Sequence, residues 1–384
     1  MSSPEKAIIP FNKPCLEGNE VGNILESVLR GKIAGDGKFN TICHKEIGED
    51  FGASFLLTTS GTAALEMSAI LCGLEPDDEV IMPSYTFVST ANAFCLMGAK
   101  PVFVDIRKDT LNINEKLIEE KITERTKAIV PVHYAGISCD MKMINEIASR
   151  HGLMVIEDAA HGFLGTDHGK LLGTFGQLGC FSFHETKSFI SGEGGAIVVN
   201  DPRLIERAEI IREKGTNRSA FFRGDVQKYT WMDVGSSYLP SDMIGAFLYG
   251  QWLERKVIIK KRQRVYDRYV DGLQCCEGKY GIQLPVIPTG AIPNYHMFYM
   301  ICHSEDQRNG LLDHLQNQGV KAVFHYIPLH SSPYAVEHYG EFDLPVTDAV
   351  SSRIIRLPFF NSLSTFEQDY IVAEVLKFFS SSLS

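Results

Sequence analysis

The fold is decided by residues 182–187, SFHETK, and by the glycine-rich residues 191–195, SGEGG, that follow them. Residues 179–183, GCFSF, read as a buried strand, so Lys187 stands just past the end of that strand. A second apolar run, residues 153–158, LMVIED, ends in two carboxylates. Buried strands with polar groups at their carboxyl ends are typical of an α/β protein whose functional residues lie in the loops at that edge of the sheet.

Outward from these two strands, apolar runs alternate with helical patterns. Further strands are predicted over residues 55–58, 79–82, 101–105, 128–132 and 196–200, and helices over residues 63–71, 91–97 and 141–151. Strands that are apolar throughout and alternate with helices indicate a mostly parallel sheet covered on both faces. Seven strands are expected in it.

The pattern changes after about residue 250. A long polar helix is predicted over residues 251–273, then shorter strands, and a last helix near residues 366–379. A chain of 384 residues also exceeds what one hydrophobic core usually holds. We therefore expect a large domain over residues 1–250 and a smaller C-terminal α+β domain over residues 251–384.

Composition narrows the classes of partner. The net charge of −10 argues against nucleic acid or an anionic membrane, and no apolar run approaches the roughly 20 residues of a membrane helix. The nine cysteines lack metal-ligand spacing, so no metal site is expected. Reduced thiols and the absence of a signal-peptide core in the first residues predict a cytoplasmic protein.

Lys187, Asp158 and the glycines suit one cofactor, pyridoxal 5′-phosphate (PLP). PLP needs a lysine amine for its aldehyde, and glycines let the backbone approach a ligand closely. A site that is low in water would lower the pKa of Lys187 and keep the amine neutral, as a nucleophile must be. Asp158 would keep the ring nitrogen protonated, although an aspartate in this position also suits a helix N-cap.

The phosphate of PLP needs its own site. Residues 59–62, TSGT, stand at a helix start, where free N–H groups and the helix dipole favour an anion. The same residue types are also ordinary caps. We expect Gly61 and Thr62 to hold the phosphate and Ser182 to add a hydroxyl.

Two further side chains with rings, Phe87 and His161, stand near the expected cofactor-binding residues in the sequence. Phe87 follows a predicted strand and either stacks on the cofactor or packs in the core. His161 lies three residues after Asp158 and either caps locally or lies near the ring. The order of the set, a phosphate turn, an aromatic, an aspartate and then Ser-x4-Lys, favours the cofactor.

With these residues in place, the chain resembles the fold-type I, PLP-dependent sugar-nucleotide aminotransferases of the DegT/DnrJ/EryC1/StrS family. The resemblance covers nearly the whole chain. It rests on residues 59–65 (TSGTAAL), 78–87 (DEVIMPSYTF), 104–105 (VD), 157–162 (EDAAHG) and 179–183 (GCFSF). It implies that Lys187 binds the cofactor covalently and moves the proton, that Asp158 pairs with the ring nitrogen, and that Phe87 stacks on the ring.

The family also implies a homodimer in which each active site is completed by the partner subunit. Many members carry a Gly-x-Asn-Tyr-Arg-like segment that reaches the neighbour's phosphate, whereas this chain has residues 235–239, GSSYL. Ser236 or Ser237 would then replace the usual contact. Arg218 and Arg223 are candidates for the diphosphate of a sugar nucleotide, because the guanidinium fork matches phosphate oxygens. Each could equally be an exposed loop arginine.

Four strings narrow the resemblance to members that form dTDP-4-amino-4,6-dideoxygalactose for enterobacterial common antigen or lipopolysaccharide O-antigen. They are residues 132–136 (VHYAG), 183–187 (FHETK), 211–219 (IREKGTNRS) and 323–330 (VFHYIPLH). The implied substrates are L-glutamate as amino donor and dTDP-4-dehydro-6-deoxy-D-glucose as acceptor, with pyridoxamine 5′-phosphate (PMP) as the intermediate form of the cofactor. His325, Tyr326 and His330 either line the sugar pocket or belong to the core.

Other functions share part of this sequence pattern. The same chemistry could give the 4-amino-4,6-dideoxyglucose product, and a 3-ketosugar aminotransferase would share every cofactor residue. Relatives that dehydrate a deoxysugar replace the lysine with histidine, so Lys187 argues against them. A purely regulatory PLP-fold protein has no reason to keep the lysine, the aspartate and the phosphate turn. An ordinary amino-acid aminotransferase would show a C-terminal arginine for a second carboxylate, but the sequence around Arg353 and Arg356 does not resemble that pattern.

Overall fold

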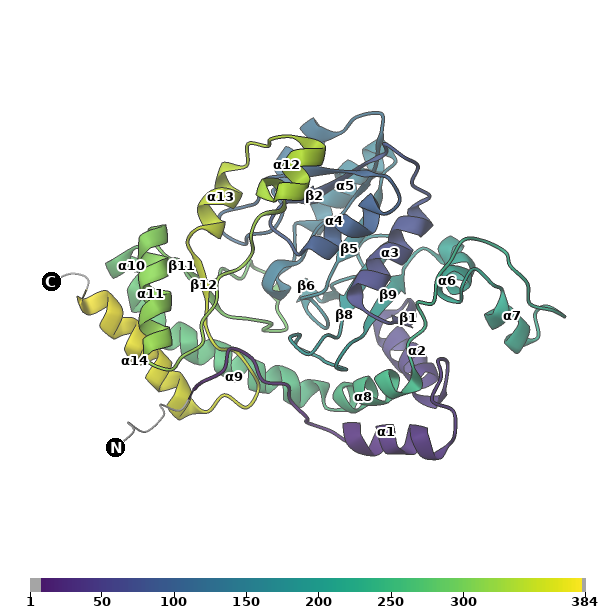
Figure 1. Ribbon diagram of the computed structural model, residues 1–384, viewed down its shortest axis with the longest axis horizontal. Coiled ribbons are helices and arrows are strands. Elements are labelled where there is room, and N and C mark those ends of the chain that lie inside the picture. The colour runs from purple at the N-terminus through teal and green to yellow at the C-terminus, as the bar shows by residue number, and fades with distance from the viewer. Residues whose placement is uncertain (1–7, 382–384) are drawn as a thin grey trace.

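A seven-stranded sheet forms the centre of the larger part of the molecule in the computed structural model, which describes residues 8–381 (Figure 1). Residues 1–6, for which no signal-peptide core is predicted, lie outside that range. The strand order is β1 (Ser54–Thr58), β9 (Gly195–Val199), β8 (Leu178–Ser182), β5 (Met154–Asp158), β4 (Thr126–Ile129), β2 (Glu79–Pro83) and β3 (Lys100–Val104). Strand β9 pairs antiparallel with both of its neighbours, and all other neighbouring pairs are parallel. The expected mostly parallel, seven-stranded sheet is confirmed, and each of its strands overlaps a predicted one.

Helices cover both faces of the sheet because successive strand residues alternate in direction. Leu56 and Ile156 pack on one face with α3 (Gly61–Cys72), α4 (Val88–Cys95) and α6 (Ile205–Arg212). Val155 packs on the other face against α5 (Met141–His151). Phe55 on that second face meets α2 (Lys38–Phe51) and α8 (Asp242–Leu253).

The helix start that matters most for the site is that of α3. The Ser60 side chain accepts a hydrogen bond of 3.0 Å from the backbone N–H of Ala63, which is the N-cap arrangement. The helix ends at Gly73, whose φ of 67° is left-handed and suits glycine. Short capping signals therefore fix where α3 begins, directly after β1.

The C-terminal part of the chain builds a second core. Its elements are α9 (Arg255–Leu273), α10 (Cys275–Tyr280), α11 (Glu305–Asn317), α14 (Thr365–Ser381) and the antiparallel pair β11 (Tyr299–Ile301) and β12 (Ile354–Arg356). The long helix predicted from residue 251 is wrong at its start, because α8 and α9 are separate helices that break at Glu254. The division at residue 250 thus falls inside α8, and the domain boundary stays a prediction.

Two segments cross between these parts. The C-terminal helices α12 (Pro333–Tyr339) and α13 (Pro345–Ser351) lie above the large sheet in Figure 1, and Ala335 and Leu344 pack in its core. At the other end of the chain, Ile9 pairs with Val320 and packs in the C-terminal core. The backbone oxygen of Phe11 then accepts a hydrogen bond from Phe359. The N-terminal residues therefore pack on the second core, while α12 and α13 bring the C-terminal part of the chain back onto the large sheet.

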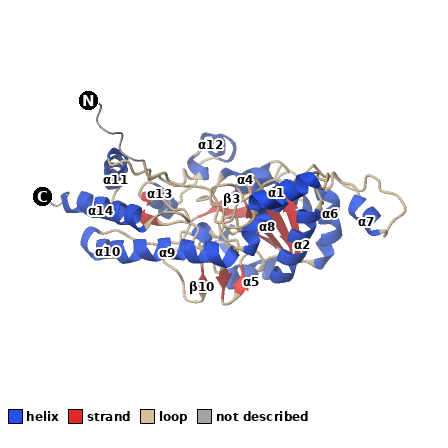
Figure 2. Ribbon diagram, turned by 90° about the horizontal axis from the view of Figure 1, so that it is seen from below, coloured by secondary structure: helices blue, strands red, loops and turns tan. Residues whose placement is uncertain are grey.

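The remaining elements lie around these cores. They are α1 (Glu20–Leu29), α7 (Arg218–Arg223), a small sheet of β10 (Ala291–Ile292), β6 (Thr166–Asp167) and β7 (Lys170–Leu171), and 3-10 turns at Glu115–Leu117, Glu119–Lys121, Tyr134–Gly136, Pro202–Leu204 and Leu329–Ser331. Helix α7 projects from the body at one end of the molecule (Figures 1 and 2). Within residues 8–381, no helix combines the length and the apolar character that crossing a membrane requires.

Candidate active site

A cavity of about 540 Å³ lies at the carboxyl ends of β1, β2, β5 and β8. The loops after these strands supply one wall, which includes Thr62, Phe87, Asp158 and Ser182. Segments from the two ends of the chain supply the other, namely Phe11, His296, His325, Tyr326 and Arg356. Residues far apart in sequence therefore share one site, at the edge of the sheet where α/β proteins bind ligands.

The cavity gathers nine of the fourteen residues singled out in the sequence. These are Gly61, Thr62, Phe87, Asp158, His161, Ser182, Lys187, His325 and Tyr326. The other five, Arg218, Arg223, Ser236, Ser237 and His330, are not part of its lining in this chain.

Lys187 enters the cavity from the turn that follows β8. Its backbone N–H bonds to the oxygen of His184, and its ammonium has no hydrogen-bond or ion-pair partner among the described residues. Burial lowers the pKa of Lys187 to about 8, nearby Asp158 opposes that shift, and Arg356 adds to it. The amine is thus much easier to deprotonate than that of an ordinary lysine.

Asp158 is buried at the end of β5, and its carboxylate is held from one side only. The hydroxyl of Thr90 donates to Oδ2 at 2.7 Å, and the N–H of Ala160 approaches Oδ1 at 3.1 Å. Thr86 Oγ1 lies 2.8 Å from Thr90 Oγ1, so the two threonines form a short hydroxyl chain behind the carboxylate. The other side of Asp158 faces the cavity, where it can bind a protonated ring nitrogen.

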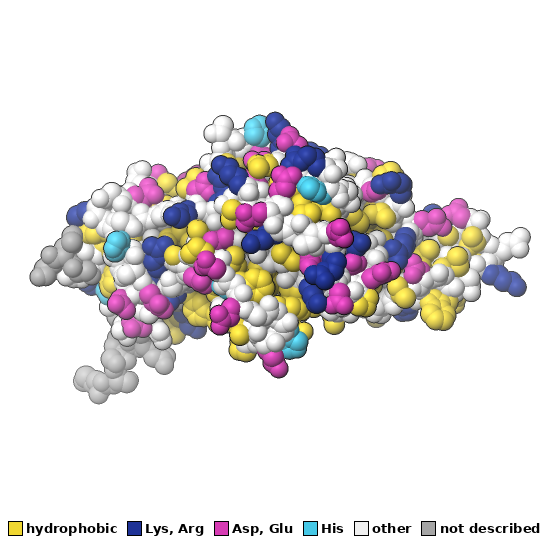
Figure 3. All heavy atoms as spheres, turned by 90° about the horizontal axis from the view of Figure 1, so that it is seen from above, with side chains coloured by type: hydrophobic (Ala, Val, Ile, Leu, Met, Phe, Trp, Pro, Cys, Tyr) yellow, Lys and Arg dark blue, Asp and Glu magenta, His cyan; other side chains and the backbone are white. Residues whose placement is uncertain are grey.

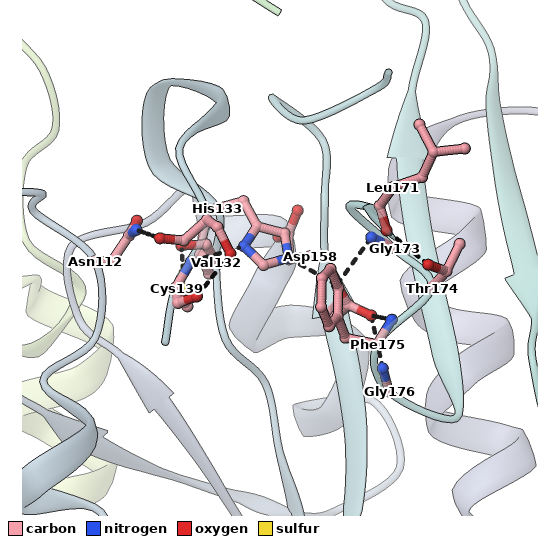
Figure 4. A network of polar contacts seen from close by, with 12 residues as sticks. Asn112, Val132, His133, Cys139, Asp158, Leu171, Gly173, Thr174, Phe175 and Gly176 are labelled. Carbon is pink, nitrogen blue, oxygen red and sulfur yellow. Dashed lines mark hydrogen bonds and ion pairs between the residues drawn. The ribbon is translucent and has the colours of Figure 1, made fainter. Parts of the chain in front are cut away.

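The neighbouring carboxylate, Glu157, has no such opening. It is fully buried and accepts backbone N–H bonds from Gly173, Phe175 and Gly176 at 2.6 to 2.8 Å. His133 Nε2 lies 2.8 Å from Oε2. Because His133 Nδ1 accepts from the backbone of Cys139, the His133 proton is on Nε2 and points at Glu157. Figure 4 shows this network between His133 and the loop at residues 171–176.

The phosphate turn lies against β8. A Cβ added at Gly61 would come within 2.8 Å of the Ser182 Cβ, so only glycine lets the two segments lie this close. The N–H groups of Gly61 and Thr62 have no hydrogen-bond partner among the described residues, as expected for the first turn of α3. These donors and the hydroxyl of Ser182 form an anion cradle at the edge of the cavity.

Three histidines form a cluster that joins the two walls, since His161 follows β5 whereas His296 and His325 come from the C-terminal part of the chain. His161 stacks on His296 with ring centroids 4.3 Å apart, and His325 bonds through Nδ1 to the hydroxyl of Tyr134 at 2.9 Å. Burial, with contributions from nearby cations, holds the pKa of each of the three rings well below its usual range. All three are therefore neutral. His161 Nε2 lies 3.3 Å from the Tyr326 hydroxyl, while its Nδ1 is buried and finds no partner in the part of the chain that the structure describes.

Phe87 presents its ring to the same space. Its side chain is 56% exposed although it lines the cavity, and its ring centroid lies 6.3 Å from that of Tyr326. An apolar face this open is available for stacking on a flat ligand.

Several cavity residues escaped the sequence analysis. His296 and Phe11 carry no local motif, and Arg356 was set aside because of its sequence context. Arg356 sits at the end of β12, with its guanidinium 4.8 Å above the Phe11 ring. Its Nε is buried and has no hydrogen-bond partner within residues 8–381. No short-range signal could have found these residues, because only the packing of the two chain ends against the large sheet brings them in.

The predicted substrate residues outside the cavity have partners elsewhere. His330 is buried between Ser84 Oγ, at 2.7 Å from Nδ1, and Asp348, at 3.2 Å from Nε2. This placement gives no support to the prediction that His330 lines the sugar pocket of this chain.

The two loop arginines stand on the projecting α7. Arg218 pairs with Glu213 at 3.0 Å, and Arg223 pairs with Glu209 and Asp225. Ser236 and Ser237 lie exposed near the base of the same projection, where Ser236 accepts a backbone bond from Lys214. None of the four can act in this chain's own cavity as it stands.

The arrangement fits PLP. It offers a lysine with a lowered pKa, a buried carboxylate with one open side, an anion cradle at a helix start and an exposed aromatic face, all in one cavity. Within residues 8–381, no group of three or more His, Cys, Asp or Glu side chains is placed to hold a metal ion.

Comparison with known proteins agrees with this reading. The sequence pattern of the DegT/DnrJ/EryC1/StrS aminotransferase family matches residues 15–376. The chain is 32% identical to an uncharacterised protein of Methanocaldococcus jannaschii, MJ1066, over 98% of both chains.

Two solved structures show the same fold over almost the whole chain. The aminotransferase TlmJ from Streptoalloteichus hindustanus has a TM-score of 0.90 at 27% identity, covering 98% of this chain and all of that one. Helicobacter pylori PseC, an aminotransferase of pseudaminic acid biosynthesis, has a TM-score of 0.89 at 26% identity, covering 97% of this chain and all of that one. With the residues for the cofactor in one cavity, the chain belongs to the DegT/DnrJ/EryC1/StrS aminotransferase family and is a PLP-dependent aminotransferase.

Proposed function

We propose that the protein transfers the amino group of L-glutamate to dTDP-4-dehydro-6-deoxy-D-glucose, giving dTDP-4-amino-4,6-dideoxy-D-galactose and 2-oxoglutarate. One observation carries the proposal. Three of the four strings that resemble the transaminases of this product, residues 132–136, 183–187 and 323–330, contribute side chains to the cavity. Most of the strings that resemble this subgroup therefore lie beside the cavity in which the substrate would bind.

The roles of the residues follow from their positions. Bound in the cavity, PLP would supply an electron sink for the carbon that loses its proton. Lys187 takes the proton from the α-carbon of L-glutamate and, in the second half-reaction, delivers a proton to C4 of the sugar. Asp158 holds the ring nitrogen protonated, and the cradle of Gly61, Thr62 and Ser182 fixes the phosphate. The face from which Lys187 reaches C4 decides between an axial and an equatorial amine.

The proposed assembly is a homodimer with shared active sites. The projecting segment around α7 exposes Phe222, Trp231 and Val234, with 58 to 79% of each side chain accessible. Figure 3 shows hydrophobic side chains beside charged ones on this projecting end. A second copy of the chain would cover these residues, and Ser236, Ser237, Arg218 and Arg223 would then reach the partner's cavity.

The proposed location is the cytoplasm, where the product would feed a surface polysaccharide such as enterobacterial common antigen or O-antigen. All nine cysteines are free thiols in the structure, and Cys43 and Cys180 are fully buried. Free thiols suit a reducing compartment. The polysaccharide rests on the sequence resemblance alone.

The test is an assay of the wild-type protein with both substrates, with the C4 configuration of the product read from proton couplings by NMR. An axial amine, absent from a Lys187→Ala control, is the expected result. An equatorial amine would move the assignment to the 4-amino-4,6-dideoxyglucose product. No turnover, with cofactor bound, would reject this acceptor and favour a 3-ketosugar nucleotide.

A further inference from the structure

The first turn of α4 places a buried hydroxyl directly behind Asp158. Thr90 is fully buried, and its Oγ1 donates to Asp158 Oδ2 at 2.7 Å. The backbone N–H of Thr90 bonds to the oxygen of Phe87, the N-cap residue of the helix, at 3.0 Å. A β-branched side chain in a helix has few rotamers, so Thr90 offers its hydroxyl from a fixed position.

A second threonine decides the direction of this hydrogen-bond chain. Thr86 is also buried, and its Oγ1 lies 2.8 Å from Thr90 Oγ1. A hydroxyl has one proton, and that of Thr90 is directed at Asp158. The bond between the two hydroxyls therefore uses the Thr86 proton, and Thr90 accepts it. The chain runs one way, from Thr86 through Thr90 to the carboxylate.

The same turn of α4 also contacts the rest of the expected cofactor site. Ser89 Oγ lies 2.7 Å from Thr62 Oγ1 in the phosphate turn. Phe87, directly before the first residue of the helix, turns its open face to the cavity. One short helix thus sets the spacing between the anion cradle, the aromatic face and the carboxylate that Thr90 holds.

We propose that Thr90 is a positioning residue, which holds the Asp158 carboxylate against the ring nitrogen of PLP and so keeps that nitrogen protonated. The inference rests on the proposed function only in giving Asp158 this partner, and it assumes nothing about the sugar. Apart from Thr90, the only donor to Asp158 among the described residues is the N–H of Ala160, at 3.1 Å. Without the hydroxyl the carboxylate is free to rotate, and its attraction for the ring proton falls as its charge moves away.

A second buried threonine–aspartate bond lies away from the cavity. Thr347 Oγ1 donates to Asp105 Oδ1 at 2.7 Å, and both side chains are buried. Asp105 also accepts from the backbone N–H groups of Ile106, Val346 and Thr347 at 2.8 to 2.9 Å. It is not part of the cavity lining. This bond matches that of Thr90 in type, length and burial, so its loss should cost stability without touching the cofactor.

The test reads the ring nitrogen without turnover. Each protein is loaded with PLP that carries ¹⁵N in its ring, because the chemical shift separates a protonated from a neutral nitrogen, and the Kd for PLP is measured by equilibrium dialysis. Thr90→Val replaces the hydroxyl by a methyl group, and we expect the signal to move toward the neutral position and the Kd to rise about tenfold. Thr90→Ser keeps the hydroxyl and should keep the wild-type signal. Thr347→Val, the matched control, should lower Tm and leave both cofactor readouts unchanged.

Three results would overturn the proposal: a wild-type signal in Thr90→Val, an equal change in Thr90→Ser, or the same change in Thr347→Val. If Thr90→Val does not fold, Thr86→Val removes the donor behind Thr90. A smaller movement of the signal in the same direction is then expected, and an unchanged signal would overturn the role of the chain.

Asp158→Asn separates the inference from its premise. An unchanged signal in that variant would reject the pairing of Asp158 with the ring nitrogen, and the role of Thr90 with it. A moved signal in Asp158→Asn and none in Thr90→Val would reject the role of Thr90 alone. Failure of the proposed sugar nucleotide to react would leave both readouts decisive, because neither involves the acceptor.

Discussion

Glu157 and Asp158 are consecutive residues of β5, but Glu157 is enclosed by hydrogen-bond donors and Asp158 lines the cavity. Glu157 accepts four hydrogen bonds, from three backbone amides and from His133, and is closed to solvent and ligand. Asp158 accepts bonds from Thr90 and Ala160 and keeps a side open to the cavity. The same charge on the same strand therefore serves to hold the fold in one place and to bind a ligand in the next.

Two arginines repeat the contrast, Arg262 buried and Arg356 half-buried with a buried Nε. Arg262 and Arg356 each stack on a phenylalanine at 4.8 Å. The guanidinium of Arg262 donates to Tyr295, Asn361 and His296 at 2.6 to 3.0 Å. That of Arg356 has no such acceptor among the described residues. A buried polar group with complete partners stabilises the protein, and one with a missing partner marks where a ligand belongs.

The largest effect should come from Lys187, whose amine has no polar partner among the described residues. Lys187→Ala should lower the turnover rate by about 10⁴-fold or more, because both the covalent attachment and the proton transfer depend on that amine. The thermal stability of the cofactor-free protein should not fall, since no hydrogen bond of the side chain is lost. Product formation and calorimetry on the same sample check both parts. A large drop in Tm would contradict the claim that Lys187 serves only the site.

The two carboxylates should respond in opposite ways. Asp158→Asn should lower turnover by about 10²-fold or more with little loss of stability, because it weakens the hold on the protonated ring nitrogen. Glu157→Gln places an NH₂ group against backbone donors and should destabilise the protein by about 3 kcal/mol. Urea unfolding and turnover per folded molecule measure the pair. Equal stability losses in the two variants would contradict the distinction between Glu157, which stabilises the fold, and Asp158, which serves the ligand.

Arg262 and Arg356 test, through stability alone, whether a polar group with complete partners stabilises the protein more than one without them. Arg262→Met leaves three acceptors unpaired and should destabilise the cofactor-free protein by about 3 kcal/mol. Arg356→Met removes an uncompensated charge and should be neutral or stabilising by about 1 kcal/mol. Differential scanning calorimetry without substrate decides between them. A destabilised Arg356→Met protein would mean that the guanidinium has a structural partner in solution.

The smallest effect concerns pH. Because burial lowers the pKa of Lys187 to about 8, the fraction of neutral amine rises about tenfold per pH unit below 8 and levels off above it. The rate at which cofactor-free protein binds PLP covalently should follow that curve, as read by stopped-flow absorbance. A rate that keeps rising toward pH 10.5, as for an ordinary lysine, would place Lys187 in contact with bulk water.

The sequence predicted the large sheet well because its strands are apolar throughout and end in polar loops. Phe87, Asp158 and Lys187 stand at such ends, so their meeting follows from the rule that parallel strands share one carboxyl edge. Boundaries were less predictable where no breaker is present. The break between α8 and α9 at Glu254 has neither glycine nor proline to signal it.

The second wall of the site could not be read in the same way. Phe11, His296 and Arg356 come from segments whose positions depend on packing across hundreds of residues. His330 shows the converse case, since a histidine in a family-like string is engaged by Ser84 and Asp348, as the core alternative expects, and is not part of the cavity lining. Local sequence patterns predict on which helix, strand or loop a side chain stands. Only the tertiary structure decides whether its polar atoms face the cavity or are hydrogen-bonded to other residues.

The N-terminal segment has a consequence for how the protein is made. Ile9 bonds to Gly319 and Lys321, and Phe11 bonds to Phe359, residues that are synthesised more than 300 positions later. All seven strands of the large sheet are available once residue 199 has emerged, so that sheet can form during translation. The wall made of Phe11 and Arg356 cannot close until Arg356 has left the ribosome. A nascent chain therefore carries a half-open site, and the segment around Ile9 and Phe11 is among the last parts to take its native place.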